Sequence, residues 1–290
     1  MIAFLLAGLA GVCFGALAVA VRTGLTRAPE PYVGPFVASA VACVLVVVAA
    51  AVSGDLGDAS PGSLWPYAVI GLAVPGLSQI LFVRAIRDAG PARAAVLIGT
   101  APLISAVLAI AFLDETFGPA LAIGTVLIVA GGALLAFEGA RPAHFKAIGA
   151  VLAIVCAVLF ALRDNLVRAV SRGDEIPALA GASASLAGST LALLLFLVVV
   201  RRGRDLDRRL GHTTMAFLPA GIFLGAAYCV LLEAFARGNV TIVAPLNATQ
   251  SLWAVLFSAL LLRRTESIGS RLVVASVLIV AGSAVIGATR

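Results

Sequence analysis

The hexapeptide Val-Leu-Ile-Val-Ala-Gly occurs twice in this chain of 290 residues, at Val126–Gly131 and again at Val277–Gly282. Each copy lies in a long apolar run that follows a short turn of the pattern Glu-x-x-Gly, at Glu115–Gly118 and at Glu266–Gly269. A self-match at a fixed distance indicates the architecture before any local pattern does. The two copies lie about half a chain apart, so the sequence predicts two similar halves.

The composition is that of a membrane protein. Hydrophobic residues make up 62% of the chain and charged residues only 12%, and the mean hydropathy is +1.13. A soluble domain has roughly 45–50% apolar and 25% charged residues. We therefore expect a multi-pass protein of the plasma (cytoplasmic) membrane, of the prokaryotic kind. The net charge of +6 does not indicate a nucleic-acid partner.

Ten apolar runs approach the length of roughly 20 residues that a helix needs to cross a bilayer. They are Ile2–Val21, Val33–Val52, Trp65–Val83, Ala92–Leu113, Gly118–Phe137, Phe145–Leu166, Ala178–Val200, Thr214–Ala236, Val240–Leu262 and Ile268–Ala288. Backbone groups in lipid must pair within the segment, so these runs are helices. The sequence therefore predicts an all-α membrane protein with ten transmembrane helices. We expect the first run to be a retained span rather than a signal peptide.

Five spans in each half is an odd number, so the second half enters the membrane with the opposite orientation. The expected halves are residues 2–137 and 145–288, separated at Glu138–His144. They align further, because Leu9-Ala10-x-Val12-Cys13 matches Leu152-Ala153-x-Val155-Cys156 and Ala85 matches Ala234. An inverted repeat of this kind recurs in secondary transporters. The alternative is chance similarity between helices rich in Leu, Val and Ala.

Two ordered sets of motif residues carry a resemblance to a known family. The first set is Ala85, Gly90, Pro102, Leu113, Glu115, Gly118, Leu127, Ile128 and Gly131, and the second is Ala234, Ala236, Glu266, Gly269, Leu278, Ile279 and Gly282. In these residues the chain resembles the EamA family of the drug/metabolite transporter superfamily. The resemblance implies a carrier with its substrate path between the halves. One departure is Ser251, which stands at the position aligned with Pro102.

Span nine has the densest set of polar side chains. Asn247, Gln250 and Ser251 stand at i, i+3 and i+4, which places them on one helix face. Trp253 lies near the middle of the span, away from the interfaces where tryptophan is usual. Polar groups at this depth line a cavity or join helices through hydrogen bonds worth about 0.6 kcal/mol on average. We favour cavity lining for the cluster and leave single residues open.

Aligned positions in the other half extend the candidate substrate-binding set. Gln79 in span three aligns with Tyr228 in span eight, and Thr100 in span four aligns with Thr249 in span nine. Paired polar positions near a pseudo-two-fold axis are where a transporter site is expected. The candidate site therefore consists of Asn247, Gln250, Ser251, Trp253, Gln79, Tyr228 and Thr100.

Three prolines and two sets of small residues mark irregular or close-packed places. Pro75, Pro102 and Pro245 each free a carbonyl inside a span, for a kink or for a solute. Small residues at every fourth position, which allow close helix approach, occur in spans one and seven. They are Gly11, Gly15, Gly181, Ser185 and Ser189.

Acidic residues are missing from the middle of every predicted span. Glu233 and Asp164 come closest, each near a span end. Proton coupling generally needs a desolvated carboxylate, so it is disfavoured here. We expect the solute to be a neutral, zwitterionic or weakly amphipathic metabolite, possibly amino-acid-like.

No metal or cofactor site is predicted. The cysteines lie in four different apolar runs, at Cys13, Cys43, Cys156 and Cys229, and His144 and His212 lie in connections. An enzyme is disfavoured, because the adjacent acids Asp114-Glu115 and Asp174-Glu175 have no histidine nearby.

Fifteen of the 20 Lys and Arg residues lie in or beside odd-numbered connections. The positive-inside rule then puts both termini outside the cytoplasm. The family resemblance suggests the reverse.

The sequence therefore predicts a carrier of a small metabolite, an exporter or exchanger, that works by alternating access with the lipid bilayer as its surroundings. The alternative is a lipid-carrier flippase or a non-transporting membrane partner on the same fold. Monomer and homodimer remain equally open.

Overall fold

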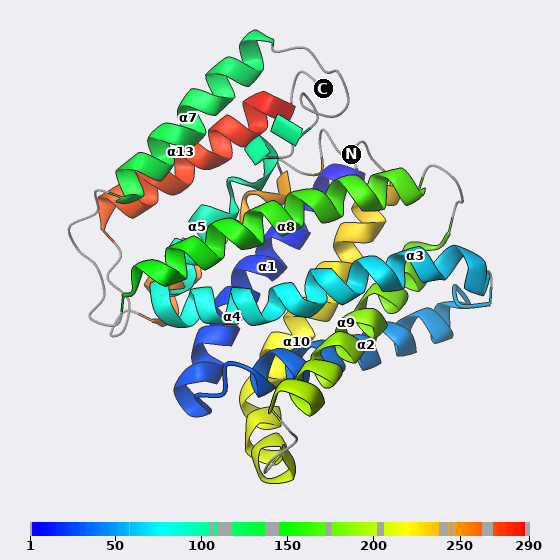
Figure 1. Ribbon diagram of the computed structural model, residues 1–290. Coiled ribbons are helices and arrows are strands. Elements are labelled where there is room, and N and C mark those ends of the chain that lie inside the picture. Colours follow the sequence, from blue (N-terminus) through cyan, green and yellow to red (C-terminus); the bar gives the residue numbers. More distant parts are fainter. Residues whose placement is uncertain are drawn as a thin grey trace.

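The computed structural model describes residues 2–57, 59–104, 107–108, 118–136, 145–171, 176–201, 206–237, 243, 246–262 and 269–287. Every regular element within these residues is a helix (Figure 1), as predicted. The elements are α1 (Ile2–Arg27), α2 (Val33–Ser53), α3 (Pro61–Gly71), the π-helical η1 (Leu72–Leu77), α4 (Ser78–Ala89), α5 (Pro91–Ile98), α7 (Pro119–Ala136), α8 (Ala147–Ser171), α9 (Ala178–Arg201), α10 (Leu206–Arg237), α12 (Gln250–Leu261) and α13 (Ser270–Gly287).

Six of the described helical stretches are long and apolar enough to cross a membrane. They are Ile2–Arg27, Val33–Ser53, Pro61–Ala89, Ala147–Val167, Ala178–Val199 and Leu210–Arg237. The third of these runs through α3, η1 and α4 but is kinked at Val74, whose backbone is not helical and which is joined to Pro75 by a cis peptide bond. Four shorter apolar helices lie within the predicted spans four, five, nine and ten. They are Pro91–Ile104, Pro119–Leu135, Gln250–Leu261 and Ser270–Ile286.

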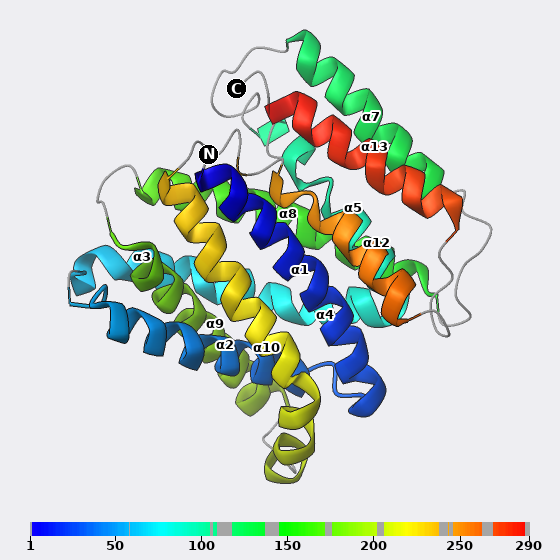
Figure 2. The ribbon, with the colours of Figure 1, turned by 180° about the vertical axis from the view of Figure 1, so that it is seen from behind.

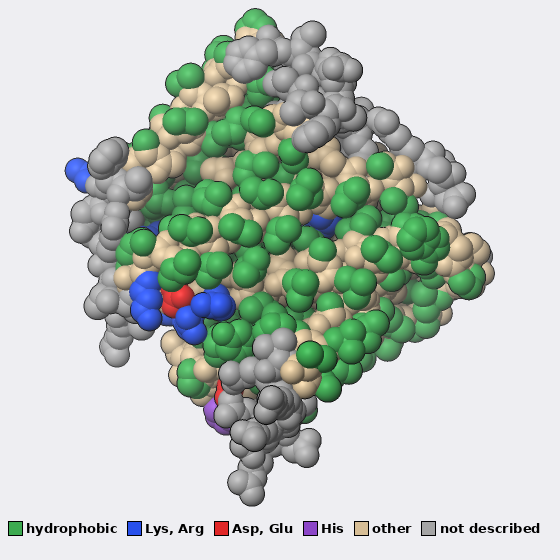
Figure 3. Space-filling view, in the orientation of Figure 1, with side chains coloured by type: hydrophobic (Ala, Val, Ile, Leu, Met, Phe, Trp, Pro, Cys, Tyr) green, Lys and Arg blue, Asp and Glu red, His purple; other side chains and the backbone are tan. Residues whose placement is uncertain are grey.

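The outer surface is apolar, as contact with lipid requires. On α2, Val44, Val48 and Val52 recur every fourth residue with 63%, 55% and 84% of their surface exposed. Figure 3 shows that hydrophobic side chains cover most of the face seen in Figure 1. The charged side chains on that face gather toward one edge, where α4 ends. This distribution fits a helix bundle surrounded by acyl chains.

Two predicted boundaries are wrong. α10 begins at Leu206, so residues 206–213 are helical rather than a connection, and His212 lies in a helix. By contrast, the apolar span of α8 ends at Val167, one residue beyond the predicted end at Leu166, although the helix itself continues to Ser171. The predicted fourth span is interrupted, because α5 stops at Ile98. Apolar run length alone does not register a helix that continues into polar sequence or one that breaks within apolar sequence.

The two halves interlock rather than packing as separate bundles. α1 packs on α10, and in the second half its counterpart α8 packs on α4 (Figures 1 and 2). Likewise α2 packs on α10, and its counterpart α9 packs on α3 and η1. Each of these contacts joins helices from different halves. Each half therefore packs its first two helices on helices of the other half.

The repeated hexapeptides lie in α7 and α13, which pack against each other. A Cβ atom on Gly124 would come within 2.7 Å of the Gly282 carbonyl oxygen, and one on Gly131 within 2.9 Å of the Ala275 carbonyl oxygen. The contacts run in opposite sequence order, so the two helices are antiparallel. Ile128 and Ile279, which occupy the same position in the two copies, are both buried between them. The glycines let the backbones touch, which is how helices associate in lipid.

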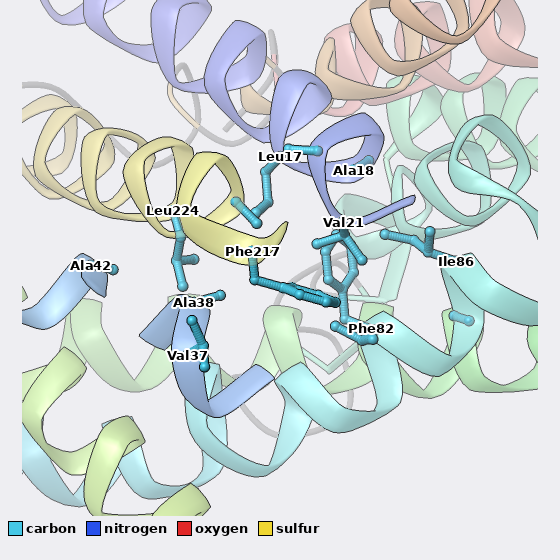
Figure 4. Packing of buried hydrophobic residues seen from close by; sticks show 14 of the residues in the cluster. Leu17, Ala18, Val21, Val37, Ala38, Ala42, Phe82, Ile86, Phe217 and Leu224 are labelled. Carbon is cyan, nitrogen blue, oxygen red and sulfur yellow. The ribbon is translucent and has the colours of Figure 1, made fainter. Parts of the chain in front are cut away.

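The largest core cluster joins helices from both halves. Figure 4 shows the Phe217 ring reaching from α10 toward Val21 of α1 and Phe82 of α4. The ring also covers Gly34 of α2, where a Cβ atom would collide with it. Between apolar helices in lipid, such packing stabilises through van der Waals contact, because acyl chains are as apolar as the side chains.

The adjacent glycines of α7 test this packing. We expect Gly131→Leu to lower the free energy of unfolding by about 1–3 kcal/mol, because the side chain would overlap α13. Gly132→Leu is the matched control, since nothing lies within 4 Å of its position, and leucine favours a helix more than glycine does. Thermal unfolding of the detergent-solubilised protein measures both. Equal melting temperatures for the two variants would contradict the packing described here.

Candidate functional site

Two helices are interrupted at aligned positions. α5 ends at a turn formed by Gly99 and Thr100, and a helix resumes at Ala101. The Thr100 backbone N–H donates to the Leu97 carbonyl oxygen at 3.1 Å, and the Thr100 hydroxyl donates to the same oxygen at 2.7 Å. The backbone N–H and the side chain of Thr100 therefore share one carbonyl at the end of the interrupted helix.

The second half repeats this turn before α12. Thr249 aligns with Thr100, and its backbone N–H donates to the Leu246 carbonyl oxygen at 3.1 Å. Its hydroxyl donates to the same oxygen at 2.6 Å. Span nine is thus interrupted where span four is, although Ser251 replaces the aligned proline.

A small cavity of about 30 Å³ lies at these interruptions. A water molecule needs about 10–15 Å³ of such space, so the cavity has room for no more than a few waters. Its walls come from both halves, through the end of α5 and its turn, the middle of α8 and the start of α12. They are formed by Ile98, Gly99, Ala101, Pro102, Phe160, Arg163, Asp164, Asn247, Ala248 and Gln250. We call this the central cavity.

Arg163 is the charged group at the centre of this arrangement. Its Nε donates to the Asp164 carboxylate at 2.9 Å, and its Nη2 lies 2.8 Å from the same oxygen. Its Nη1 donates to the Tyr228 hydroxyl of α10 at 3.1 Å. The guanidinium also lies 5.2 Å from the Phe160 ring centroid and 5.6 Å from that of Tyr228, within cation–π range.

The sequence analysis missed Arg163 by treating it as a flanking charge. Both Arg163 and Asp164 lie within the predicted span, which ends at Leu166, and within α8, which continues to Ser171. Their side chains are only 7% and 15% exposed. The available signal was the adjacent opposite charges between leucines 162 and 166 on a continuing helical pattern. Charges inside a span are expensive and mark functional positions.

A second Arg–Asp pair shows what an ordinary position looks like. Arg87 and Asp88, also adjacent in sequence, pair at 2.8 Å in the last turn of α4. The Arg87 side chain is 37% exposed at the end of the bundle, whereas its partner Asp88 is 4% exposed and has Lys146 and Arg84 as further cations nearby. Position in the helix therefore distinguishes the two pairs.

The predicted polar cluster of span nine divides between cavity and packing. Asn247 and Gln250 line the central cavity. Ser251 is buried and accepts a hydrogen bond from the Ser276 hydroxyl of α13 at 3.2 Å, which is interhelical packing. Trp253 lies beside Phe257, with ring centroids 5.8 Å apart, and packs near Gly15 of α1. The single continuous face that we predicted is broken by the turn at Thr249.

The remaining predicted residues differ in how they relate to the central cavity. Thr100 belongs to the helix interruption, and Tyr228 contacts Arg163. Gln79 is buried in α4 with 4% of its surface exposed, and it does not line the central cavity. The Oδ1 atom of Asn247 is buried with no hydrogen-bond partner among the described residues.

A larger hollow of about 530 Å³ opens where α8 and α10 end. We call it the vestibule. Tyr67 of α3 and the start of α9 complete its wall, and the Glu233–Arg237 ion pair lies on it. The lining residues are Tyr67, Val167, Ile176, Pro177, Ala178, Gly181, Leu232, Glu233, Phe235, Ala236 and Arg237. Sites for small molecules usually measure about 300–1,000 Å³, so the vestibule has room for a metabolite.

The small-residue positions of spans one and seven are helix contacts within the chain. Gly11 and Gly15 lie against Thr249 and Trp253 at the start of α12. In span seven, Ser185 packs on Gly71. The Ser189 hydroxyl of the same span hydrogen bonds to Ser39 of α2 at 2.7 Å.

Several predicted positions lie outside the described residues. They are Asp114, Glu115, Glu138–His144, Asp174, Glu175, Pro245 and Glu266. Within the described part of the chain, no three His, Cys, Asp or Glu side chains form a potential metal-binding group.

Comparisons with known proteins agree with the predicted resemblance. A model of the EamA-like transporter family matches residues 1–137 and again residues 147–288. Seventeen chains of solved structures are similar. One crystal structure aligns with a TM-score of 0.68 over 98% of this chain and 95% of that chain, at 24% identity, which shows a shared fold. No curated protein matches in sequence.

The Arg163–Asp164 pair can be tested by substitution. We expect Arg163→Met to destabilise the protein by about 3–5 kcal/mol, because it leaves the Asp164 carboxylate buried without its cation. Adding Asp164→Leu restores most of the lost stability, since two apolar side chains leave no buried charge unpaired. Arg87→Met costs less, because Arg84 and Lys146 remain as cations near the Asp88 carboxylate. Thermal unfolding measures all three, and a double variant no more stable than Arg163→Met contradicts the assignment.

Proposed function

Because this chain belongs to the EamA-like transporter family, we propose that it carries a small polar metabolite across the membrane by alternating access between two inverted five-span halves. The family is one of membrane transporters, within the drug/metabolite transporter superfamily. The observation that carries the proposal is the central cavity. Its wall combines interrupted helices from both halves with an ion pair and two amide side chains.

The inverted relation of the halves is supported by the antiparallel packing of α7 on α13. Equivalent residues Ile128 and Ile279 meet at that contact, as they do when an axis in the membrane plane relates two repeats. The exchange of partners between α1, α10, α8 and α4 has the same symmetry. Ten spans follow if the four shorter apolar helices also cross the bilayer.

The contacts also suggest which parts move. The first group comprises α1, α2, α10 and α12, and the second comprises α3, η1, α4, α5, α8 and α9; each contains helices from both halves. The groups meet mainly where α2 packs on α9 and where α5 packs on α12, and the central cavity lies at the second of these contacts. We propose that rocking of these two groups, rather than of the two halves, alternately opens the cavity.

The cavity wall favours a solute that is neutral overall and polar. The ion pair contributes both signs of charge, Gln250 can donate and accept, and the unpartnered Oδ1 of Asn247 requires a donor. A zwitterionic or hydroxyl-bearing metabolite satisfies these groups. The present volume is too small for such a solute, so binding requires the two helix groups to separate.

The lipid-carrier flippase remains the alternative. A lipid substrate would need an apolar wall continuous with the acyl chains, whereas the central cavity carries four polar side chains. This lining favours a water-soluble solute.

Transport can be tested by counterflow in liposomes containing the purified protein, with a panel of amino acids, nucleosides and amphipathic metabolites. We expect exchange of at least one polar solute, and we expect Asn247→Ala to lower it by about tenfold, as loss of one hydrogen bond in the cavity would. Asn165→Ala is the matched control, because Asn165 is on α8 but does not line the central cavity.

Two results would contradict the proposal. One is the absence of counterflow across the whole panel with folded protein, which would favour the lipid carrier or the non-transporting partner. The other is loss of flux in Glu233→Gln together with full flux in Asn247→Ala. That outcome would move the essential group to the vestibule.

An even number of spans places both ends of the chain on one side. We expect compartment-specific reporters before Met1 and after Arg290 to give the same signal, outside the cytoplasm by the charge bias. Both reporters in the cytoplasm would reverse the orientation in favour of the family resemblance. Reporters on opposite sides would rule out ten spans.

A further inference from the structure

We propose that Arg163 and Tyr228 form a partition between the vestibule and the central cavity, and that the partition opens preferentially for solutes with an anionic oxygen group. The proposal rests on the proposed function and adds a position of selection to it. It follows from where the two side chains lie, from the bonds that the guanidinium makes and from the helices that it joins.

The first step is the order of residues along α8 and α10. On α8, Arg163 lines the central cavity, and Val167, one turn further on, lines the vestibule. On α10, Leu232 lines the vestibule, and Tyr228 stands one turn before it. Residues four apart share a helix face. The contact between Arg163 and Tyr228 therefore lies between the two hollows.

The second step is the burial of the two side chains. Arg163 and Tyr228 are only 7% and 2% exposed. The Tyr228 ring also makes an edge-to-face contact with Phe14 of α1, with ring centroids 6.3 Å apart. Nη1 of Arg163 donates to the tyrosine hydroxyl at 3.1 Å. The two side chains thus form a buried contact between the residues that line the vestibule and those that line the central cavity.

The third step is the chemistry of the guanidinium. Asp164 binds one edge, through Nε and Nη2. The other edge presents Nη1 and Nη2, and there the partner of Nη1 is the neutral Tyr228 hydroxyl. An oxyanion accepts two parallel hydrogen bonds from such an edge, which a single hydroxyl does not. A carboxylate or sulfonate arriving from the vestibule can therefore replace Tyr228 while Asp164 stays bound.

The fourth step is the mechanical consequence. α8 belongs to the second helix group and α10 to the first, so the Arg163–Tyr228 hydrogen bond ties the two moving groups together. When an oxyanion takes the place of the hydroxyl, that tie is released. Binding at Arg163 and separation of the helix groups are thus the same event.

The test measures access to the cavity without relying on transport. In full-length protein whose four native cysteines are replaced, Asn247→Cys reports on the central cavity and Ala236→Cys on the vestibule. Two methanethiosulfonate reagents of similar size are compared, one with a sulfonate and one with a trimethylammonium group. After normalisation to the rate at position 236, we expect the sulfonate reagent to modify position 247 about tenfold faster, because a charged hydrogen bond favours its entry.

Two variants separate this role from a structural one. Tyr228→Phe keeps the ring and its contact with Phe14 but removes the competing hydroxyl, so it raises the sulfonate rate at position 247 several-fold. Arg163→Gln combined with Asp164→Asn keeps hydrogen-bonding side chains but removes both charges of the buried pair, so it abolishes the preference for the anion without leaving a lone carboxylate. Both variants leave the rates at position 236 unchanged.

The proposal is overturned if the two reagents react equally fast at position 247, or if Tyr228→Phe accelerates both by the same factor. It is also overturned if position 247 is unmodified in every variant while position 236 reacts. Failure of the proposed function gives a different result. In that case no solute shows counterflow, whatever the labelling rates are.

Discussion

A helix that stops inside a bilayer must satisfy its last carbonyl groups without water, and the rest of this structure depends on how two helices meet that requirement. Thr100 and Thr249 do so in the same way, since each donates through both its backbone N–H and its hydroxyl to the carbonyl three residues earlier. Their short turns leave a hollow that a continuous helix would fill. The two turns occupy aligned positions in the two halves and face the same cavity. Polar side chains can therefore gather there without leaving the carbonyl groups of these turns unpaired.

The second constraint is the charge of Arg163. A guanidinium in the membrane interior is tolerated when its surroundings replace water. Here a carboxylate, a phenol and two aromatic rings do so. Its partners come from different helix groups, because Asp164 is on the same helix whereas Tyr228 is on α10. Asp164 is on the same helix and therefore stays close to the Arg163 charge, whereas the hydrogen bond to Tyr228 depends on how α8 and α10 are packed. This division makes Arg163 a suitable point for coupling binding to movement.

Much of the fold is visible in the sequence, because the lipid leaves few alternatives. Apolar runs become helices, and the repeated hexapeptide predicts the pair of helices that contact each other through Gly124 and Gly282. The aligned threonines of spans four and nine also form equivalent turns. What the sequence could not give is the direction of side chains after a turn. Asn247 and Gln250 face the cavity, whereas Ser251 packs on α13, and only the geometry of the interruption separates them. Arg163 was missed because the sequence analysis considered only acidic residues within the spans and counted the arginines as flanking charges.

The close contacts indicate which surfaces can slide and which cannot. Glycines pack α2 on α10 at Gly221 and Gly225, and they pack α3 on α9 at Gly71 and Gly188. Backbones in such contact resist relative movement, because every displacement separates many atoms at once. Where a described glycine of either group packs on another helix of these groups, the two helices belong to the same group. None of these glycine contacts crosses the boundary between the groups. At that boundary the contacts are made by side chains, among them the hydroxyls of Ser39 and Ser189. The helices that approach most closely therefore lie within one group, and the central cavity lies at the boundary between the groups, where α5 packs on α12. Helix packing alone thus places the cavity at a boundary that none of the close glycine contacts between the groups' described helices crosses.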